Sequence, residues 1–187
     1  MHMVKLTVRG VRLLPVAIIF LCCLILQQSV SASPFGQGLF GADVPFGSGT
    51  SMSITLGGDV SFNLTPSGQN FTGTGSHIVT VTSTDVVGYK LYAYSPNGTD
   101  MTNGSETIPA SGNGSAAPLS VNSWGYNTDA SSNFVGMLTT PSLIKDADGP
   151  FKNGDNTTIT YGVLTNITKG AGAYAISPVY TLVAESQ

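Results

Sequence analysis

The sequence predicts an all-β protein that folds as an antiparallel β-sandwich, and three observations support this. Charged residues make up only 9% of the 187 residues, while glycine occurs 23 times. Beyond the N-terminal region, no long stretch has the apolar spacing of an amphipathic helix. Several short stretches instead alternate apolar and polar residues between clusters of turn-forming residues. This combination is typical of immunoglobulin-like or jelly-roll-like sandwiches with many turns.

The alternation is clearest near the C-terminus, in residues 156–185. Ile159, Tyr161 and Val163 alternate with polar or small residues, and the even positions of residues 174–182 are all apolar. A glycine-containing turn at residues 169–172 separates the two stretches, which predicts a hairpin with one apolar face. Since a hairpin is not stable alone, the rest of the chain must supply a facing sheet.

The remaining strands are predicted from the same signals. Residues 52–56 and 60–64 alternate around a Gly-Gly-Asp turn and predict a first hairpin. Further strands are expected at residues 77–82, 87–94, 119–126 and 134–138, with 143–144 as an extension of the last. A polar excursion at residues 95–118 and a polar loop at residues 146–156 separate them. About eight or nine strands at this spacing favour a sandwich.

In the stretch 87–94 the alternation also assigns the two faces. Tyr89, Leu91 and Ala93 are expected to point into the core. Lys90, Tyr92 and Tyr94 would then point outward together.

The N-terminus reads as a signal peptide, which we expect to form a helix. Three basic residues precede an apolar run at residues 13–26, and Val30-Ser31-Ala32 fits the small-x-small pattern of a cleavage site. We therefore assign residues 1–32 to the signal peptide. An uncleaved anchor is the alternative, although the run is shorter than the ~20 residues of a spanning helix.

The exported chain then has two parts. Residues 33–49 are rich in glycine and proline and contain Phe35, Phe40 and Phe46, so we interpret them as a leader. The phenylalanines would dock on the domain or present apolar surface to a neighbouring molecule. Residues 50–187 form the β-sandwich domain.

The positions of the cysteines and the net charge indicate whether disulfides are expected and which partners are excluded. Both cysteines, Cys22 and Cys23, lie in the signal peptide, so the exported domain is expected to contain no disulfide. Four lysines and ten acids remain after cleavage, a net charge of 4 − 10 = −6. This charge argues against nucleic acid and anionic membranes as partners, leaving an uncleaved signal peptide as the only expected membrane contact.

Four short motifs suggest a family. Residues 84–91 read Thr-Asp-Val-Val-Gly-Tyr-Lys-Leu, residues 108–110 read Ile-Pro-Ala, and residues 119–126 contain Leu-x-x-Asn-x-Trp-Gly-Tyr. Residues 158–162 read Thr-Ile-Thr-Tyr-Gly, followed by Gly-Ala-Tyr at 172–174. Over residues 50–185 the chain resembles uncharacterised bacterial cell-surface proteins with an immunoglobulin-like or WxL-like β-sandwich. The resemblance implies export and a surface location and supplies no catalytic residues.

Aromatic residues provide the first candidate binding site. Trp124 is the only tryptophan, and with Tyr126, Tyr92 and Tyr94 it would form a platform on which a sugar ring stacks. The alternative is that Trp124 anchors the core, as a tryptophan on a sandwich strand commonly does.

Carboxylates provide the second candidate. Asp146, Asp148 and Asp155 fall in one polar stretch, and Ca²⁺ takes six to eight oxygen ligands of this kind. Their spacing is not that of an EF-hand, and aspartate is also common in solvated turns. We therefore expect no cofactor, with calcium at this loop as the alternative.

No catalytic constellation is visible. His77 is the only histidine after the signal peptide, and its neighbour Ser76 would point to the opposite face of a strand. We therefore expect that the protein is not an enzyme. The sequence also contains Asn-x-Ser/Thr sequons, several of which this composition would produce by chance; they begin at Asn63, Asn70, Asn97, Asn103, Asn113, Asn156 and Asn166.

Together these observations predict a secreted or cell-surface, non-catalytic β-sandwich protein, an adhesin-like module or a surface-structure subunit. Its expected partner is a surface protein or a glycan, and self-association would suit a structural subunit. The loops at residues 95–118 and 130–132 are where we expect contact with a partner. The alternative function is a carbohydrate-binding module, assisted by calcium.

Overall fold

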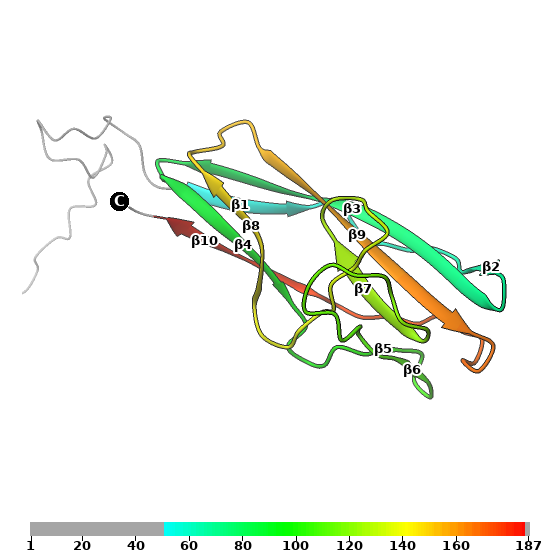
Figure 1. Cartoon of the computed structure of the whole chain (residues 1–187). Coiled ribbons are helices and arrows are strands. Elements are labelled where there is room, and N and C mark those ends of the chain that lie inside the picture. Colours follow the sequence, from blue (N-terminus) through cyan, green and yellow to red (C-terminus); the bar gives the residue numbers. More distant parts are fainter. Residues whose placement is uncertain (1–50, 186–187) are drawn as a thin grey trace, which may run out of the picture. The chain divides into compact units, whose positions relative to one another are not determined.

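A computed structural model describes residues 51–185. Within this range the chain is all-β and forms an antiparallel β-sandwich, which confirms the predicted fold class (Figure 1). The signal-peptide helix, its cleavage site and the leader at residues 33–49 lie outside the described residues. Residues 51–185 contain no helix long and apolar enough to cross a membrane.

The first sheet has five strands, and every neighbouring pair in it is antiparallel. Its order is β1-β3-β9-β7, with the short β2 also paired to β3. The strands are β1 (Ser51–Leu56), β2 (Thr65–Ser67), β3 (Asn70–Thr84), β7 (Ser123–Asn127) and β9 (Asp155–Asn166).

The second sheet has three strands in the order β10-β4-β8, also antiparallel. They are β4 (Gly88–Tyr94), β8 (Ser142–Asp148) and β10 (Val179–Glu185). A separate two-stranded hairpin joins β5 (Met101–Thr102) to β6 (Thr107–Ile108).

The core lies between the two sheets and follows the predicted alternation. Tyr89, Leu91 and Ala93 are at most 1% exposed, whereas the residues between them on β4 are half-buried. The first sheet faces them with residues that are also buried, namely Val79, Val81, Trp124, Ile159, Tyr161 and Val163. The predicted directions of the side chains on β4 and β9 are therefore confirmed.

The predicted C-terminal hairpin is wrong. β9 pairs with β3 and β7 in the first sheet, whereas β10 pairs with β4 in the second. Residues 167–178 carry the chain from one sheet to the other. Alternation shows which face of a strand is apolar, but two strands that share a core can face each other across it instead of pairing.

The predicted first hairpin is also wrong. β1 pairs with β3 as far as Leu56, opposite Val79, and β2 resumes this edge with Thr65 opposite Thr72. Between them the eight residues 57–64 accompany only the six residues 73–78 of β3, so the chain bulges away from the ladder.

Two glycines of β3 accommodate this bulge. A Cβ atom on Gly73 would lie 2.9 Å from side-chain atoms of both Phe62 and Leu64. A Cβ on Gly75 would lie 2.6 Å from Phe62. The apolar side chains of the bulge therefore pack against β3 at these two glycines, where β3 has no side chain.

The polar excursion at residues 95–118 is anchored rather than free. Its Met101 and Ile108 are buried in the core. Backbone hydrogen bonds join the Trp124 N–H to the Pro109 carbonyl and the Ser111 N–H to the Trp124 carbonyl. Of the strand expected at residues 134–138, only Phe134 and Val135 form isolated bridges. Residues 143–144 belong to the separate strand β8, which also includes residues 146–148 of the expected loop.

Candidate functional site

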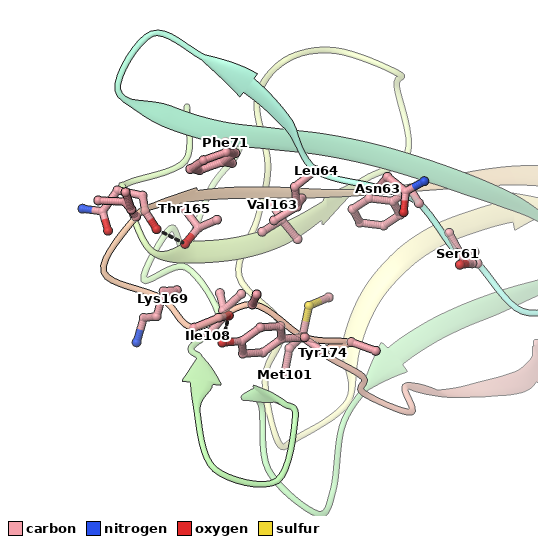
Figure 2. Close-up of a pocket in the computed structure, with 18 residues that line it drawn as sticks. Ser61, Asn63, Leu64, Phe71, Met101, Ile108, Val163, Thr165, Lys169 and Tyr174 are labelled. Atoms are coloured by element: carbon pink, nitrogen blue, oxygen red, sulfur yellow. Dashed lines mark hydrogen bonds between the residues drawn. The ribbon is translucent and has the colours of Figure 1, made fainter.

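The candidate site is a crevice that exists because the two sheets have strands of different length. β3 has 15 residues and β9 has 12, but β4, β8 and β10 have seven each. One end of the first sheet therefore extends past the second sheet. Residues 60–64, the β5–β6 hairpin and residues 167–174 surround this uncovered inner face (Figure 2).

The crevice consists of two adjoining cavities of about 790 and 470 Å³. Both are lined by Val60, Met101 and Tyr174, so the two cavities lie next to each other. Figure 2 shows Leu64 and Val163 on one side of the larger cavity and the ring of Tyr174 on the other. The larger cavity is lined mainly by apolar residues, whereas the smaller one also includes Asp59, His77 and Ser177. Lys169 is the one lysine or arginine that lines either cavity in the described part of the chain.

The walls of the crevice are two chain segments that do not pair with each other. Residues 56–64 form one wall and residues 167–180 form the other. In the described part of the chain, residues 58–64 and 176–178 make no backbone–backbone hydrogen bond. Because each such backbone amide still needs a partner, these groups are available to water or to a bound segment.

A histidine and two tyrosines line the smaller cavity and link the two sheets. The Nε2 atom of His77 lies 2.9 Å from the hydroxyl of Tyr180, and this hydroxyl lies 2.5 Å from that of Tyr161. His77 and Tyr161 belong to the first sheet and Tyr180 to the second. The other ring nitrogen of His77, Nδ1, is buried and has no hydrogen-bond partner among the described residues.

Burial governs the protonation of this cluster. It lowers the pKa of His77 below 6.5, an effect that the nearby polar backbone of Gly58 partly offsets. Burial also raises the pKa of Tyr161 and of Tyr180 above 10.0. All three side chains are therefore neutral near pH 7, and the cluster presents hydrogen-bonding groups without charge.

The surroundings of His77 differ from those of a catalytic histidine. Ser76 is exposed, whereas His77 lies on the core side of β3. The described hydrogen-bond partner of the imidazole is a tyrosine hydroxyl, where a triad has a serine on one nitrogen and a carboxylate on the other. Asp59 is the one carboxylate that lines either cavity, and it is exposed.

Trp124 and Tyr126 do not form the predicted ligand platform. Trp124 is 0% exposed, and its Nε1 donates a hydrogen bond to the carbonyl of Thr99 over 2.9 Å. Tyr126 is 4% exposed on the same strand. Their ring faces are covered by the core, so this part of the prediction is corrected in favour of the core anchor.

Tyr92 and Tyr94 lie elsewhere, on the outer face of the second sheet. They are half-buried, and their cross-strand neighbours on this face include Leu143 and Val179, both partly exposed. The four predicted aromatic residues therefore occupy two different sheets and do not converge. A single strand pattern cannot reveal this, because it leaves open which strands are neighbours.

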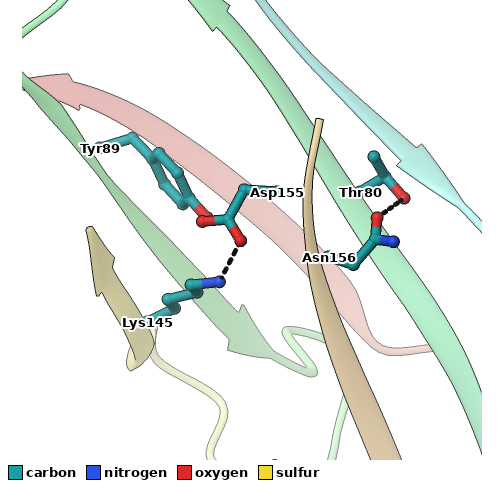
Figure 3. A network of polar contacts seen from close by, with 5 residues as sticks. All are labelled: Thr80, Tyr89, Lys145, Asp155 and Asn156. Atoms are coloured by element: carbon teal, nitrogen blue, oxygen red, sulfur yellow. Dashed lines mark hydrogen bonds and ion pairs between the residues drawn. The ribbon is translucent and has the colours of Figure 1, made fainter. Parts of the chain in front are cut away.

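The predicted calcium ligands do not meet either. Asp155 accepts a hydrogen bond from the hydroxyl of Tyr89 over 2.7 Å and pairs with Lys145 Nζ, also over 2.7 Å (Figure 3). Asp146 lies 3.5 Å from Lys90 Nζ, on the outer face of the second sheet. Asp148 is exposed two residues further along β8.

The three aspartates are thus dispersed, and within residues 51–185 no three histidine, cysteine, aspartate or glutamate side chains gather in a way that would hold a metal ion. Asp155 instead links the two sheets, because Tyr89 lies on β4, Lys145 on β8 and Asp155 on β9. Burial raises the pKa of Tyr89 above its usual 10.0. The hydrogen bond to Asp155 and the negative charge of that carboxylate raise it further.

The crevice itself was not predicted from the sequence. Both of its walls carry the signal of a half-buried strand, since apolar residues alternate at 60–64 and at 174–182. The pattern does not show that these segments face each other across an open space. No protein-family model matches the chain, and no curated protein matches it.

Proposed function

We propose that this protein is a secreted or cell-surface, non-catalytic β-sandwich that serves in adhesion or surface structure. It does so by holding an extended apolar segment of a partner polypeptide in the crevice. The observation that carries the proposal is the pair of walls on either side of the crevice, in which residues 58–64 and 176–178 make no backbone–backbone hydrogen bond in the described part of the chain.

The chemistry of the walls favours a polypeptide over a small polar ligand. An added strand gains affinity from backbone hydrogen bonds and specificity from pockets that take alternate side chains. The backbone groups of residues 58–64 that lack a backbone partner can form these hydrogen bonds, and the spaces beside Phe62 and Tyr174 can take the side chains. The hydroxyls of Tyr161 and Tyr180 add polar contacts at one end.

A glycan partner has less support. With Trp124 and Tyr126 in the core, stacking would fall to Tyr92 and Tyr94, which are half-buried on the outer face of the second sheet. Binding to a glycan array that survives substitution in the crevice would favour this alternative.

The proposal is tested with an array of eight-residue peptides that alternate apolar and polar residues. Scrambled peptides of the same composition complete the array. We expect the alternating peptides to bind and the scrambled ones to bind at least 10-fold more weakly, because only the former place all apolar side chains on one face.

A blocking variant assigns the binding to the crevice. Ala173 is exposed and lines the larger cavity, so Ala173→Arg fills the cavity without disturbing the core. We expect it to abolish peptide binding, whereas Thr139→Arg, at an exposed position outside the crevice, leaves binding unchanged. Equal binding by both variants, or no preference for alternating peptides, contradicts the proposal.

A further inference from the structure

We infer that the occupant of the crevice is residues 40–47 of a second copy of this chain, laid beside residues 57–64 as an added strand. This inference rests on the proposed function and names its partner. The chain would then be the repeating subunit of an assembly in which each copy is both donor and acceptor.

The donor segment has the sequence pattern that the crevice requires. Residues 40–47 read Phe-Gly-Ala-Asp-Val-Pro-Phe-Gly, so that every even position, Phe40, Ala42, Val44 and Phe46, is apolar. The odd positions are glycine, aspartate or proline. This period of two is typical of an extended strand with one buried face. Pro45 is compatible with an added strand, because proline occurs on edge strands.

The acceptor side matches this pattern in length and chemistry. Eight residues of the wall, 57–64, bulge from the β3 ladder, and eight residues make up the donor segment. Val60, Phe62 and Leu64 are half-buried at the border of the cavity, where apolar side chains of the donor would complete their burial. Burial of the donor's phenylalanines removes apolar surface from water, which favours the complex.

The length of the chain shows why the donor comes from another copy. The end of the crevice nearest to the start of β1 is beside Leu56, five residues from Ser51, which spans about 17 Å in a strand. From Gly47 to Ser51 there are only four residue steps, which reach at most about 14 Å. The same chain therefore cannot set all eight residues 40–47 beside residues 57–64 in this register, whereas a second copy has no such restriction.

Such an exchange is heterologous, because the leader of one copy meets the crevice of the next. Contacts of this type generate rings when the rotation between copies closes and filaments when it does not. Either assembly suits the proposed role in surface structure.

Cysteine cross-linking tests the inference, since the exported chain from Ser33 onward has no cysteine of its own. Asp43 falls between the apolar positions of the donor segment in the sequence, and Ser61 falls between those of the wall and is exposed. The Asp43→Cys chain and the Ser61→Cys chain are mixed under mild oxidation. Mixed disulfide dimers are then measured on non-reducing gels, with mass spectrometry of the linked peptides.

We expect mixed dimers at least 10-fold above those formed when Ser120→Cys, at an exposed position away from the crevice, replaces Ser61→Cys. In a single chain carrying both Asp43→Cys and Ser61→Cys, we expect a ladder of linked chains. An internally linked monomer in this chain, or mixed dimers at the control level, overturns the inference.

Leader variants provide a second measurement that leaves residues 51–185 untouched. We expect the chain with Phe40→Ser and Phe46→Ser to remain monomeric by light scattering at concentrations where the parent chain assembles. Phe35→Ser, outside the alternating segment, should assemble like the parent. If alternating peptides still bind in an Ala173-dependent manner while no mixed dimer forms, the proposed function stands and only this inference fails.

Discussion

At the scale of single residues, several polar side chains between the two sheets form hydrogen bonds with a side chain of the opposite sheet. Tyr89 on β4 donates to Asp155 on β9, and Tyr180 on β10 meets both His77 and Tyr161 of the first sheet. A buried polar group costs free energy when it loses its partner, so these contacts specify how the two sheets face each other. In this set of contacts, the buried Nδ1 atom of His77 has no hydrogen-bond partner among the described residues, which costs free energy.

We predict that stability falls as the pH drops below 6.5, because burial lowers the pKa of His77 in the folded protein below its unfolded value of 6.5. Above pH 6.5 the imidazole is neutral in both states. As the pH falls, the unfolded chain binds the proton first, so the free energy of unfolding decreases down to the pKa of the folded state. Chemical denaturation between pH 8 and about 5.5 measures this, in a range where carboxylates with pKa values near 4 are still ionised.

The matched control is His77→Gln, which keeps a hydrogen-bonding side chain without a titration in this range. Its stability should be nearly constant over the same interval. The same loss of stability in both proteins would show that His77 is not the group responsible.

At the scale of elements, strand length and glycine position shape the molecule. The extra length of β3 and β9 leaves an inner face that the second sheet does not cover, and the bulge at residues 57–64 only partly fills it. Glycines of β3 leave room for the bulge on the core side. On the opposite face of the first sheet, the ring of Phe134 lies over Gly162 of β9.

We predict that Gly162→Ala destabilises the fold by about 1–3 kcal/mol through overpacking. A Cβ atom at this position would lie 2.5 Å from two ring atoms of Phe134, so the ring or the strand must move. Urea denaturation of Gly162→Ala, Phe134→Leu and the double variant measures the coupling. Because leucine vacates the space, the double variant should be less destabilised than the sum of the two, by about 0.5–3 kcal/mol.

The control for this cycle is Gly114→Ala, where a Cβ atom would meet nothing within 4 Å. Its effect should be small. Strict additivity of Gly162→Ala and Phe134→Leu would mean that the ring does not occupy this space.

At the scale of the whole molecule, the described fold has neither a disulfide nor a gathered set of metal ligands. Residues 51–185 contain no cysteine, and within this range no three acidic, histidine or cysteine side chains gather in a way that would hold a metal ion. The fold is therefore maintained by the apolar core, by the two sets of backbone ladders and by polar links between the sheets such as Tyr89–Asp155.

We predict that the exported protein begins at Ser33 and that its unfolding midpoint is the same with and without a reductant or EDTA. The reason is that both cysteines precede the expected cleavage site and that Asp155 is already engaged by Tyr89 and Lys145. N-terminal sequencing and thermal unfolding measure these outcomes. A lower midpoint in EDTA that added calcium restores would instead reveal a calcium site.

The pattern of residues along the chain was enough to predict the class of the fold and the direction of many side chains. An apolar period of two identifies the buried face of a strand whatever its partner, because burial depends on the side of the sheet. Tyr89, Leu91, Ile159 and Tyr161 were predicted correctly for this reason. The alternation at residues 60–64 likewise indicated an extended segment with apolar side chains toward the core.

Only the tertiary structure decided which strands are neighbours and which side chains meet. β9 and β10 follow each other in the chain but lie in different sheets, and Trp124 and Tyr92 belong to different layers. Hydrogen-bonded pairing and packing across a core impose the same alternation on a strand, so a local pattern cannot distinguish them. The crevice is a consequence of unequal strand lengths in two sheets, a property of their stacking that no single stretch of sequence contains.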